Sequence, residues 1–232
     1  MSDIVCIIPA RGGSKNMPRK NLIDFCGAPL ISYTIIEAIK SNIFDIVYVA
    51  TDNQEIADVS MKFGASIIEL PDYLTDDVTQ ATLSCIYACK VICDKKEYKN
   101  VMMLQPTSPL RINSDICGAF IKYKNCDSEF LTSAVPIDPH YFHWALTCNN
   151  EHSDYYKLFF DDTYMKHRKF LPTVYRPDGS IKIAKIKNLL ETKNFFGKKL
   201  SIFEIPYERS IHIANAFDLE LCEFLCKKRT VQ

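Results

Sequence analysis

Residues 4–21, with the sequence IVCIIPARGGSKNMPRKN, constrain the fold more than any other stretch of the chain. The first five are apolar and mostly β-branched, which is typical of a buried strand in a parallel sheet. Residues 11–20 then combine two adjacent glycines, which let backbone N–H groups approach an anion, with four cationic side chains that neutralise its charge. The pattern predicts a strand followed by a phosphate-binding loop, with a solvated basic loop as the alternative.

This loop matches neither common nucleotide-binding motif, because GxxxxGK[ST] and GxGxxG are both absent from it. We therefore predict a nucleoside triphosphate site that is neither a Walker loop nor a dinucleotide fingerprint.

Short apolar strands alternate with helical patterns along most of the chain. This alternation predicts an α/β fold in three layers, with a mostly parallel, Rossmann-like sheet covered by helices on both faces. Ligands of such sheets lie beyond the carboxyl ends of the strands, where Arg11, Asp52 and Gln105 fall. The predicted strands are 4–8, 46–50, 66–70, 101–104, 180–184 and 200–205, and the predicted helices are 29–40, 54–63, 79–93, one from 187, and 216–227.

Composition excludes several classes of function. The 28 basic and 28 acidic side chains balance, which argues against an extended surface for nucleic acid or an anionic membrane. The sequence has no apolar run long enough to span a bilayer and no cleavable signal pattern, so we expect a cytoplasmic protein. We also expect residues 1–232 to form one domain.

The ten cysteines are predicted to be reduced. Cys85, Cys89 and Cys93 recur every fourth residue, as do Cys222 and Cys226, so each set lies along one helical stripe and acts as small apolar side chains. No CxxC pair is present, which argues against structural zinc.

Residues 137–175 interrupt the regular alternation with a stretch rich in aromatic, histidine and charged side chains. We predict an extended, β-rich excursion whose exposed aromatics meet a partner, with a decorative or disordered insertion as the alternative. His140 and His143 are expected to pack or form hydrogen bonds, since two ligands do not make a metal site.

Four motifs in order along the chain, PARGGSK, LQPTSPLR, YRPDGSI and NFFG, resemble the CMP-sialic acid synthetase family. The resemblance implies a nucleotidyltransferase that moves CMP from CTP to the anomeric hydroxyl of a nine-carbon sugar acid, such as sialic or legionaminic acid, and releases pyrophosphate. It also implies Mg²⁺ or Mn²⁺ as cofactor and a homodimer formed through the excursion. The alternatives are an enzyme for the eight-carbon acid Kdo, a sugar nucleotidyltransferase using another nucleotide, and a non-catalytic nucleotide or sugar binder.

The resemblance assigns roles to residues of this chain. Those implied to be catalytic are Arg11, Lys15 and Gln105. Those implied to bind the nucleotide are Arg11, Gly12, Gly13, Ser14, Lys15, Lys20, Asn21, Asp52 and Thr82. Those implied to bind the sugar acid are Gln105, Thr107, Ser108, Arg111, Arg168, Arg176, Phe195 and Phe196, with Arg168 gripping the carboxylate from the neighbouring subunit. Without the family, Arg168 reads as a surface arginine, the segment around Gln105 as a proline-stiffened turn, and the phenylalanines as a core pair.

The chain departs from the family where two aspartates are expected to hold Mg²⁺. His212 and Ala214 stand at those positions, and Asp218 matches a later family aspartate. Three accounts follow: the metal is carried by CTP and water with help from Asp218 or Asp178, His212 acts as a general base, or the chain binds without catalysis. The first is the prediction, with Asp218 as the metal-ligating residue.

Overall fold

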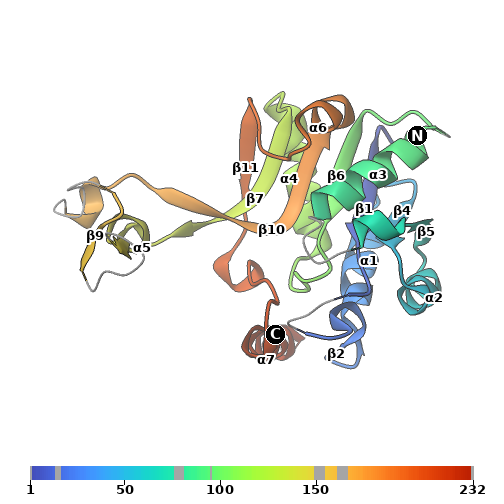
Figure 1. The fold of residues 1–232 in the computed structure, drawn as a ribbon, viewed down its shortest axis with the longest axis horizontal. Helices are drawn as coiled ribbons and strands as arrows, with labels where there is room; N and C mark the ends of the chain where they lie inside the picture. Colours follow the sequence, from blue (N-terminus) through green and yellow to red (C-terminus); the bar gives the residue numbers. More distant parts are fainter. Residues whose placement is uncertain are drawn as a thin grey trace.

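The computed structural model describes residues 2–13, 17–75, 81–94, 96–148, 155–160 and 167–230. Seven strands form one sheet in the order β11-β7-β10-β6-β1-β4-β5 (Figure 1). Their bounds are β1 Ile4–Pro9, β4 Val47–Thr51, β5 Ser66–Glu69, β6 Asn100–Leu104, β7 Phe130–Ile137, β10 Val174–Lys185 and β11 Leu200–Glu204.

Most neighbouring strands of the sheet run parallel, as predicted. β1 lies between β4 and β6 with Cys6 opposite both Val47 and Met102, and β11 runs parallel to β7. The exception is β10, which is antiparallel to both of its neighbours, β6 and β7. Side chains alternate between the two faces in antiparallel strands as they do in parallel ones. β10 therefore contributes to the helix-covered core on each side of the sheet.

Helices cover both faces of the sheet, which confirms the predicted three-layer α/β fold. Ile4, Cys6 and Ile8 of β1 pack on one face with α1, α2 and α4, whereas Val5 and Ile7 pack on the other with α3 and α6. Each fully buried aliphatic side chain of this kind contributes about 1.5–3 kcal/mol. The helices are α1 Leu30–Lys40, α2 Gln54–Lys62, α3 Ala81–Cys93, α4 Asn113–Asn125, α5 Pro139–His143, α6 Ile186–Thr192 and α7 Ala216–Thr230.

A third, smaller apolar cluster joins α7 to a hairpin made by β2 Asp24–Phe25 and β3 Ala28–Pro29. Phe25 is fully buried in it against Cys222 and Cys226 of α7. All ten cysteines are free thiols, as predicted, and the two predicted cysteine stripes lie on α3 and α7. Burial raises the pKa of the Cys222 thiol to about 12, so it stays protonated.

Beyond the sheet, β7 and β10 continue as a two-stranded ribbon, with Val174 opposite Ile137. The ribbon leads away from the body to α5 and a small hairpin of β8 Leu146–Cys148 and β9 Tyr156–Leu158 (Figure 1). We call residues 137–175, as far as they are described, the arm. Its β-rich character was predicted. The helix α5 was not, and it begins where the Asp138 carboxylate accepts a hydrogen bond from the His140 N–H at 3.0 Å.

In the part of the chain that the structure describes, no helix has both the length and the apolar character needed to cross a membrane.

Candidate active site

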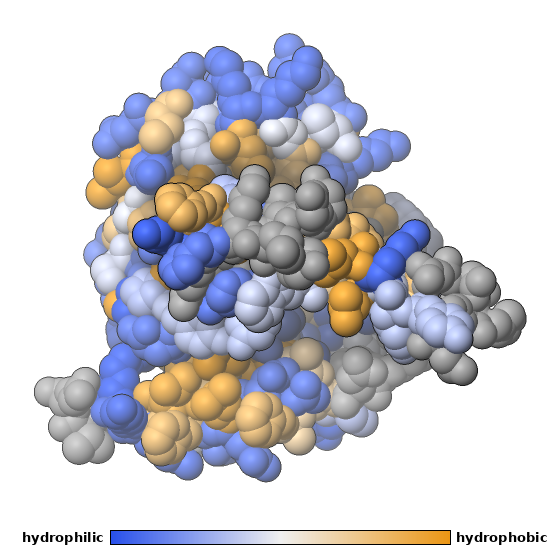
Figure 2. All heavy atoms as spheres, turned by 90° about the vertical axis from the view of Figure 1, so that its left-hand side faces the viewer, coloured by the Kyte–Doolittle hydropathy of each residue, from blue (hydrophilic) through white to orange (hydrophobic). Residues whose placement is uncertain are grey.

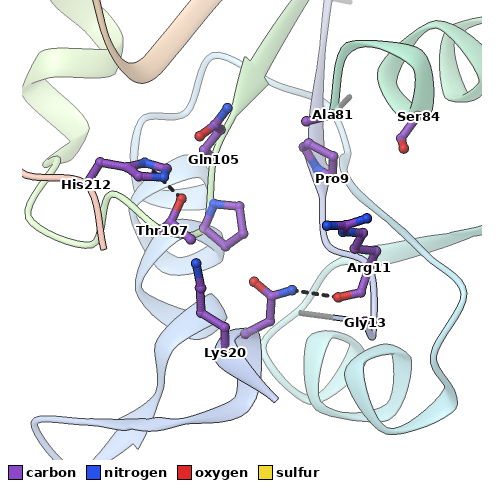
Figure 3. A pocket seen from close by; sticks show the side chains of 11 residues that line it. Pro9, Arg11, Gly13, Lys20, Ala81, Ser84, Gln105, Thr107 and His212 are labelled. Carbon is purple, nitrogen blue, oxygen red and sulfur yellow. Dashed lines mark hydrogen bonds between the residues drawn. The ribbon is translucent and has the colours of Figure 1, made fainter. Parts of the chain in front are cut away.

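A pocket opens at the carboxyl ends of β1 and β6, where ligands of such sheets are expected. The basic loop after β1 forms one side, the loop after β6 forms another, and the segment before α7 closes it (Figure 3). The described lining residues are Pro9, Arg11, Gly13, Lys20, Asn21, Ala81, Ser84, Gln105, Pro106, Thr107 and His212.

The basic loop is held open by two hydrogen bonds. The Asp52 carboxylate accepts from the Gly12 N–H at 2.7 Å, and the Asn21 side-chain amide donates to the Arg11 carbonyl at 3.0 Å. A Cβ at position 12 would lie 2.9 Å from the Cβ of Asn53, so glycine is required for this close approach. The N–H of Gly12 therefore already has an acceptor within the protein, and the Asp52 carboxylate braces the loop.

The segment before α7 seats His212 in the pocket wall. The Ile213 N–H donates to the Thr107 carbonyl at 2.8 Å, the Lys20 ammonium donates to the Ile213 carbonyl at 3.2 Å, and the Thr107 hydroxyl lies 3.1 Å from His212 Nδ1. In Figure 3, His212 and Thr107 face Arg11 across the pocket, and the Lys20 ammonium points in from below. Three separate parts of the chain are therefore tied together at one wall.

The described lining of the pocket carries positive charge. Its described lining includes the cations Arg11 and Lys20 but no aspartate or glutamate. Burial lowers the pKa of Lys20, although the nearby charge of Asp218 opposes that shift. Burial also lowers the pKa of His212, and the positive charge of Lys20 lowers it further, so the imidazole is neutral at neutral pH.

Gln105 lies in the pocket as expected, but Arg111 does not. The Arg111 guanidinium is 1% exposed and donates to the Ser180 carbonyl at 2.8 Å, the Thr34 hydroxyl at 2.7 Å and the Gln105 carbonyl at 3.3 Å. Burial lowers its pKa to about 10, which still leaves it charged at neutral pH. The expectation that Arg111 forms the wall is corrected: it positions the Gln105 loop against β10 from behind.

The other residues expected to bind the sugar acid or the nucleotide fall into two groups, those with buried side chains and those with exposed ones. Ser108 and Phe195 are buried in the protein, and Thr82 is buried on α3, so none of them presents its side chain to a ligand in this conformation. Phe196 remains 40% exposed and Arg176 is exposed where the arm leaves the sheet. The paired phenylalanines thus divide their roles, one in the core and one at the surface.

Three expected site residues cannot be placed. Ser14 and Lys15 lie outside the described residues, and so does the side chain of Arg168. Ser84 lines the pocket but was not predicted to do so. The sequence offered a reason to consider it, because it is a polar residue on a mostly apolar face of α3. The prolines Pro9 and Pro106 gave no chemical signal.

Asp218, the expected metal ligand, forms hydrogen bonds within the chain. Asp218 Oδ2 accepts hydrogen bonds from the N–H groups of Ala214 at 2.8 Å and Asn215 at 3.1 Å, and Asn215 Oδ1 accepts from the Asp218 N–H at 3.0 Å. This reciprocal pair caps the start of α7. No three His, Cys, Asp or Glu side chains gather into a possible metal site among the described residues. Mg²⁺ favours several oxygen ligands, so these residues do not fit a protein-held Mg²⁺ site.

Asp178, the second candidate carboxylate, is turned inward. Its Oδ1 accepts from the Ser133 hydroxyl and from the Ser180 N–H, and among the described residues its buried Oδ2 has no hydrogen-bond partner. Burial raises its pKa, while the hydrogen bonds from Ser133 and Ser180 oppose that shift. A carboxylate turned into the protein in this way does not face the pocket as a metal ligand.

A mostly parallel sheet with a pocket at its carboxyl edge, whose described lining includes Arg11 and Lys20, is typical of nucleotide-binding α/β proteins. The fold is similar to that of CMP:2-keto-3-deoxy-manno-octonic acid synthetase complexed with CTP, with a TM-score of 0.71, 18% identity and coverage of 98% of this chain and 100% of that one. It is also similar to 4-diphosphocytidyl-2C-methyl-D-erythritol synthase from Anaerococcus prevotii, with a TM-score of 0.67, 13% identity and coverage of 97% and 99%.

The cytidylyltransferase family model matches residues 5–229, and the chain belongs to that family. It is 36% identical over 228 residues to a pseudaminic acid cytidylyltransferase of Campylobacter jejuni, covering 96% of both chains. It is 30% identical to the CMP-N,N'-diacetyllegionaminic acid synthase of Legionella pneumophila, covering 96% of this chain and 95% of that one. It is 31% identical to an N-acylneuraminate cytidylyltransferase of Escherichia coli, covering 99% of this chain and 53% of the relative.

Proposed function

We propose that this cytidylyltransferase transfers CMP from CTP to the anomeric hydroxyl of an N-acylated nine-carbon sugar acid and releases pyrophosphate. The observation that carries the proposal is the match of the cytidylyltransferase family model to residues 5–229, together with a pocket at the carboxyl edge of the sheet that Arg11 and Lys20 line. The relatives that cover nearly the whole chain act, by their names, on pseudaminic and diacetyllegionaminic acids, so pseudaminic acid is the first acceptor to test.

The chain's own residues have positioning and electrostatic roles in this reaction. Arg11 and Lys20 neutralise the triphosphate and the negative charge that builds on the departing pyrophosphate. Gln105 offers both a donor and an acceptor to sugar hydroxyls, and Arg111 fixes its loop from the core. We extend the nucleotide site to Gly13 and Asn21 in the pocket, and to Ser14 and Lys15, which complete the basic loop in sequence.

A divalent ion, Mg²⁺ or Mn²⁺, is proposed to enter bound to the phosphates of CTP and to water. It would supply charge neutralisation at the triphosphate. The support is the absence of a carboxylate cluster among the described residues together with the capping role of Asp218. If positions 212 and 214 still lie where the family's aspartates hold the metal, His212→Asp combined with Ala214→Asp will lower the Mg²⁺ concentration needed for half-maximal rate. An unchanged metal dependence would mean that the ion lies elsewhere.

The arm is proposed to form a homodimer, with Arg168 reaching the partner's sugar-acid site. Its support is the set of exposed aromatic side chains on the arm, because surfaces of this kind mark interfaces. Figure 2 looks at the molecule from the arm's end and shows apolar side chains gathered in patches beside polar ones. We also propose that residues 1–232 act as one domain, and that the reaction takes place in the cytoplasm, where CTP is made.

The deciding experiment is a substrate panel. The four nucleoside triphosphates are incubated with pseudaminic, legionaminic and sialic acids and with Kdo, while pyrophosphate release and product mass are recorded. Release with CTP and a nine-carbon acid, with the product mass of a CMP-sugar, is the expected result. Release only with GTP or UTP and a hexose phosphate would overturn the choice of reaction, and CTP binding without turnover at saturating Mg²⁺ or Mn²⁺ would indicate a non-catalytic binder.

A further inference from the structure

Lys182 is a half-buried cation on the sheet face that also carries Gln105. It lies in β10 directly opposite Met103 of β6. Side chains two residues apart on a strand share a face, so Lys182 and Gln105, which follows Met103 by two residues, project to the same side. Gln105 lines the pocket, and Lys182 follows it on the same face of the neighbouring strand.

Aromatic rings and charges surround the Lys182 ammonium. Its Nζ lies 5.5 Å from the ring centroid of the half-exposed Phe196 and 5.9 Å from that of the buried Phe195. It is close enough to His212 for its charge to lower the pKa of that imidazole, and Cys85 and Asp178 also act on it electrostatically. Lys182 thus lies between the nucleotide pocket and the exposed phenylalanine.

Within the part of the chain that the structure describes, the ammonium of Lys182 has no acceptor. Among the described residues, neither a hydrogen bond nor an ion pair joins it to another group. Burial lowers its pKa, because a desolvated ammonium with unused donors is costly. Arg111 shows the contrasting arrangement, since it is more deeply buried but donates to two carbonyls and two hydroxyls.

We propose that Lys182 is a specificity-determining residue that donates a hydrogen bond to an oxygen of the acceptor sugar acid. Donors of Lys182 that have no protein acceptor among the described residues are available to an oxygen of a ligand, and the adjoining Phe196 ring offers an apolar surface to a methyl group. An N-acyl group presents both features, a carbonyl oxygen and a methyl. A free amine at the same position would be protonated and repelled by the ammonium. The inference rests on the proposed function, because it takes the acceptor to be a sugar acid.

The test compares Lys182→Met, which keeps the side-chain length without the charge, with Lys185→Met as the matched control. Lys185 lies on the same strand at the opposite edge of the sheet, 4.0 Å from the Asp127 carboxylate. Binding of an N-acetylated nine-carbon acid, and of the same acid with its amine free, is measured by calorimetry with a non-hydrolysable CTP analogue present. Steady-state KM values are measured in parallel, and thermal unfolding confirms that each variant is folded.

We expect Lys182→Met to weaken binding of the N-acetylated acid at least tenfold and to leave the KM for CTP within twofold. The wild-type preference for the acetylated over the free-amine acid should shrink in this variant, while Lys185→Met behaves as wild type. Equal weakening of both acids would assign the hydrogen bond to the carboxylate oxygen, and would still support Lys182 as the acceptor contact.

Two results would overturn the inference. One is unchanged acid binding in Lys182→Met, and the other is a wild-type protein that binds the CTP analogue but no sugar acid. Acid binding without pyrophosphate release would instead count against the proposed function alone, because calorimetry reads the Lys182 contact independently of turnover.

Discussion

The body of the molecule and its arm bury their apolar side chains to very different extents. Residues Ile4–Ile8 of β1 are at most 1% exposed, whereas Tyr141 of α5 is 83% exposed and Tyr156 of β9 is 62% exposed. A sheet covered on both faces supplies its own core, while a two-stranded ribbon with a short helix cannot. The contrast teaches that the body supplies its own core around the pocket, whereas the aromatic side chains of the arm stay exposed within this chain.

Within the arm, aromatic rings partly pack against one another. The rings of His140 and Trp144 stack with centroids 4.0 Å apart, and those of Phe142 and Phe160 with centroids 4.1 Å apart. Such contacts, of about 0.5–1.5 kcal/mol each, give the tip local order. They leave Tyr141 and Tyr156 facing outward, which suits a symmetric contact with a second copy.

The largest effect is expected in the body, from Arg111→Met. This change leaves the carbonyls of Ser180 and Gln105 without their buried donor and lowers the free energy of unfolding by about 3–5 kcal/mol. Urea denaturation measures it. Arg229→Met is the control, because Arg229 donates to the Leu110 carbonyl at 3.1 Å from an exposed position and should cost less than about 1 kcal/mol. Equal losses would show that the body is not organised around this buried arginine.

Next in size is a pocket variant that spares stability. Arg11→Ala removes a charge-assisted contact to the reacting phosphates and should lower kcat about 100-fold, with little change in urea midpoint. Arg19→Ala is the matched control, since Arg19 pairs with Glu55 on an exposed surface of the same loop. Pyrophosphate release measures both. A full rate in Arg11→Ala would remove this residue from the mechanism.

A smaller effect is expected in the arm. Tyr141→Ser with Tyr156→Ser should raise the dissociation constant of the proposed dimer about tenfold or more, because exposed aromatics commonly anchor interfaces. Sedimentation over a concentration series measures it, and the urea midpoint of the body should hold. Phe217→Ser on α7 is the control, as a 72% exposed ring outside the arm. A wild-type protein that sediments as a monomer at all concentrations would refute the dimer and leave the arm's aromatics unexplained.

The sequence predicted the body far better than the arm or the inner parts of the site. Apolar-rich stretches located β1, α1 and α3 within a residue or two, and the basic loop marked the pocket edge. The helix α4 was missed because polar residues balance its apolar ones, and β10 was expected to be shorter because its arm half carries exposed polar residues. Periodicity reports one-sided burial, so a ribbon exposed on both sides gives little signal.

Burial of charged side chains was the least predictable part of the site. Arg111 sits in a motif whose other members suggest a substrate wall, and only tertiary packing shows that its guanidinium points inward. The same holds for Lys182 and for the division between Phe195 and Phe196. Arg111 and the two phenylalanines lie in loops, so no period of a helix or strand indicates which of their side chains faces the core.

The smallest expected effect is a pH dependence that belongs to the pocket in the body. Burial and the charge of Lys20 lower the pKa of His212 below its ordinary 6.5. As pH falls through about 6.5, the His212 imidazole therefore takes up a proton in the unfolded chain while it stays neutral in the folded chain. The free energy of unfolding then decreases with falling pH, by at most about 1.4 kcal/mol per pH unit for one group, and the effect vanishes above that range.

His212→Gln should remove this slope, whereas His167→Gln, at an exposed position, should keep it. Urea denaturation of the three proteins at pH 7.5, 6.5 and 5.5 measures the difference. All groups other than residue 212 are common to wild type and His212→Gln, so their contributions cancel when the two slopes are subtracted. An identical slope in both would mean that His212 takes up its proton in the folded state. The pocket would then carry a third cation at mildly acid pH.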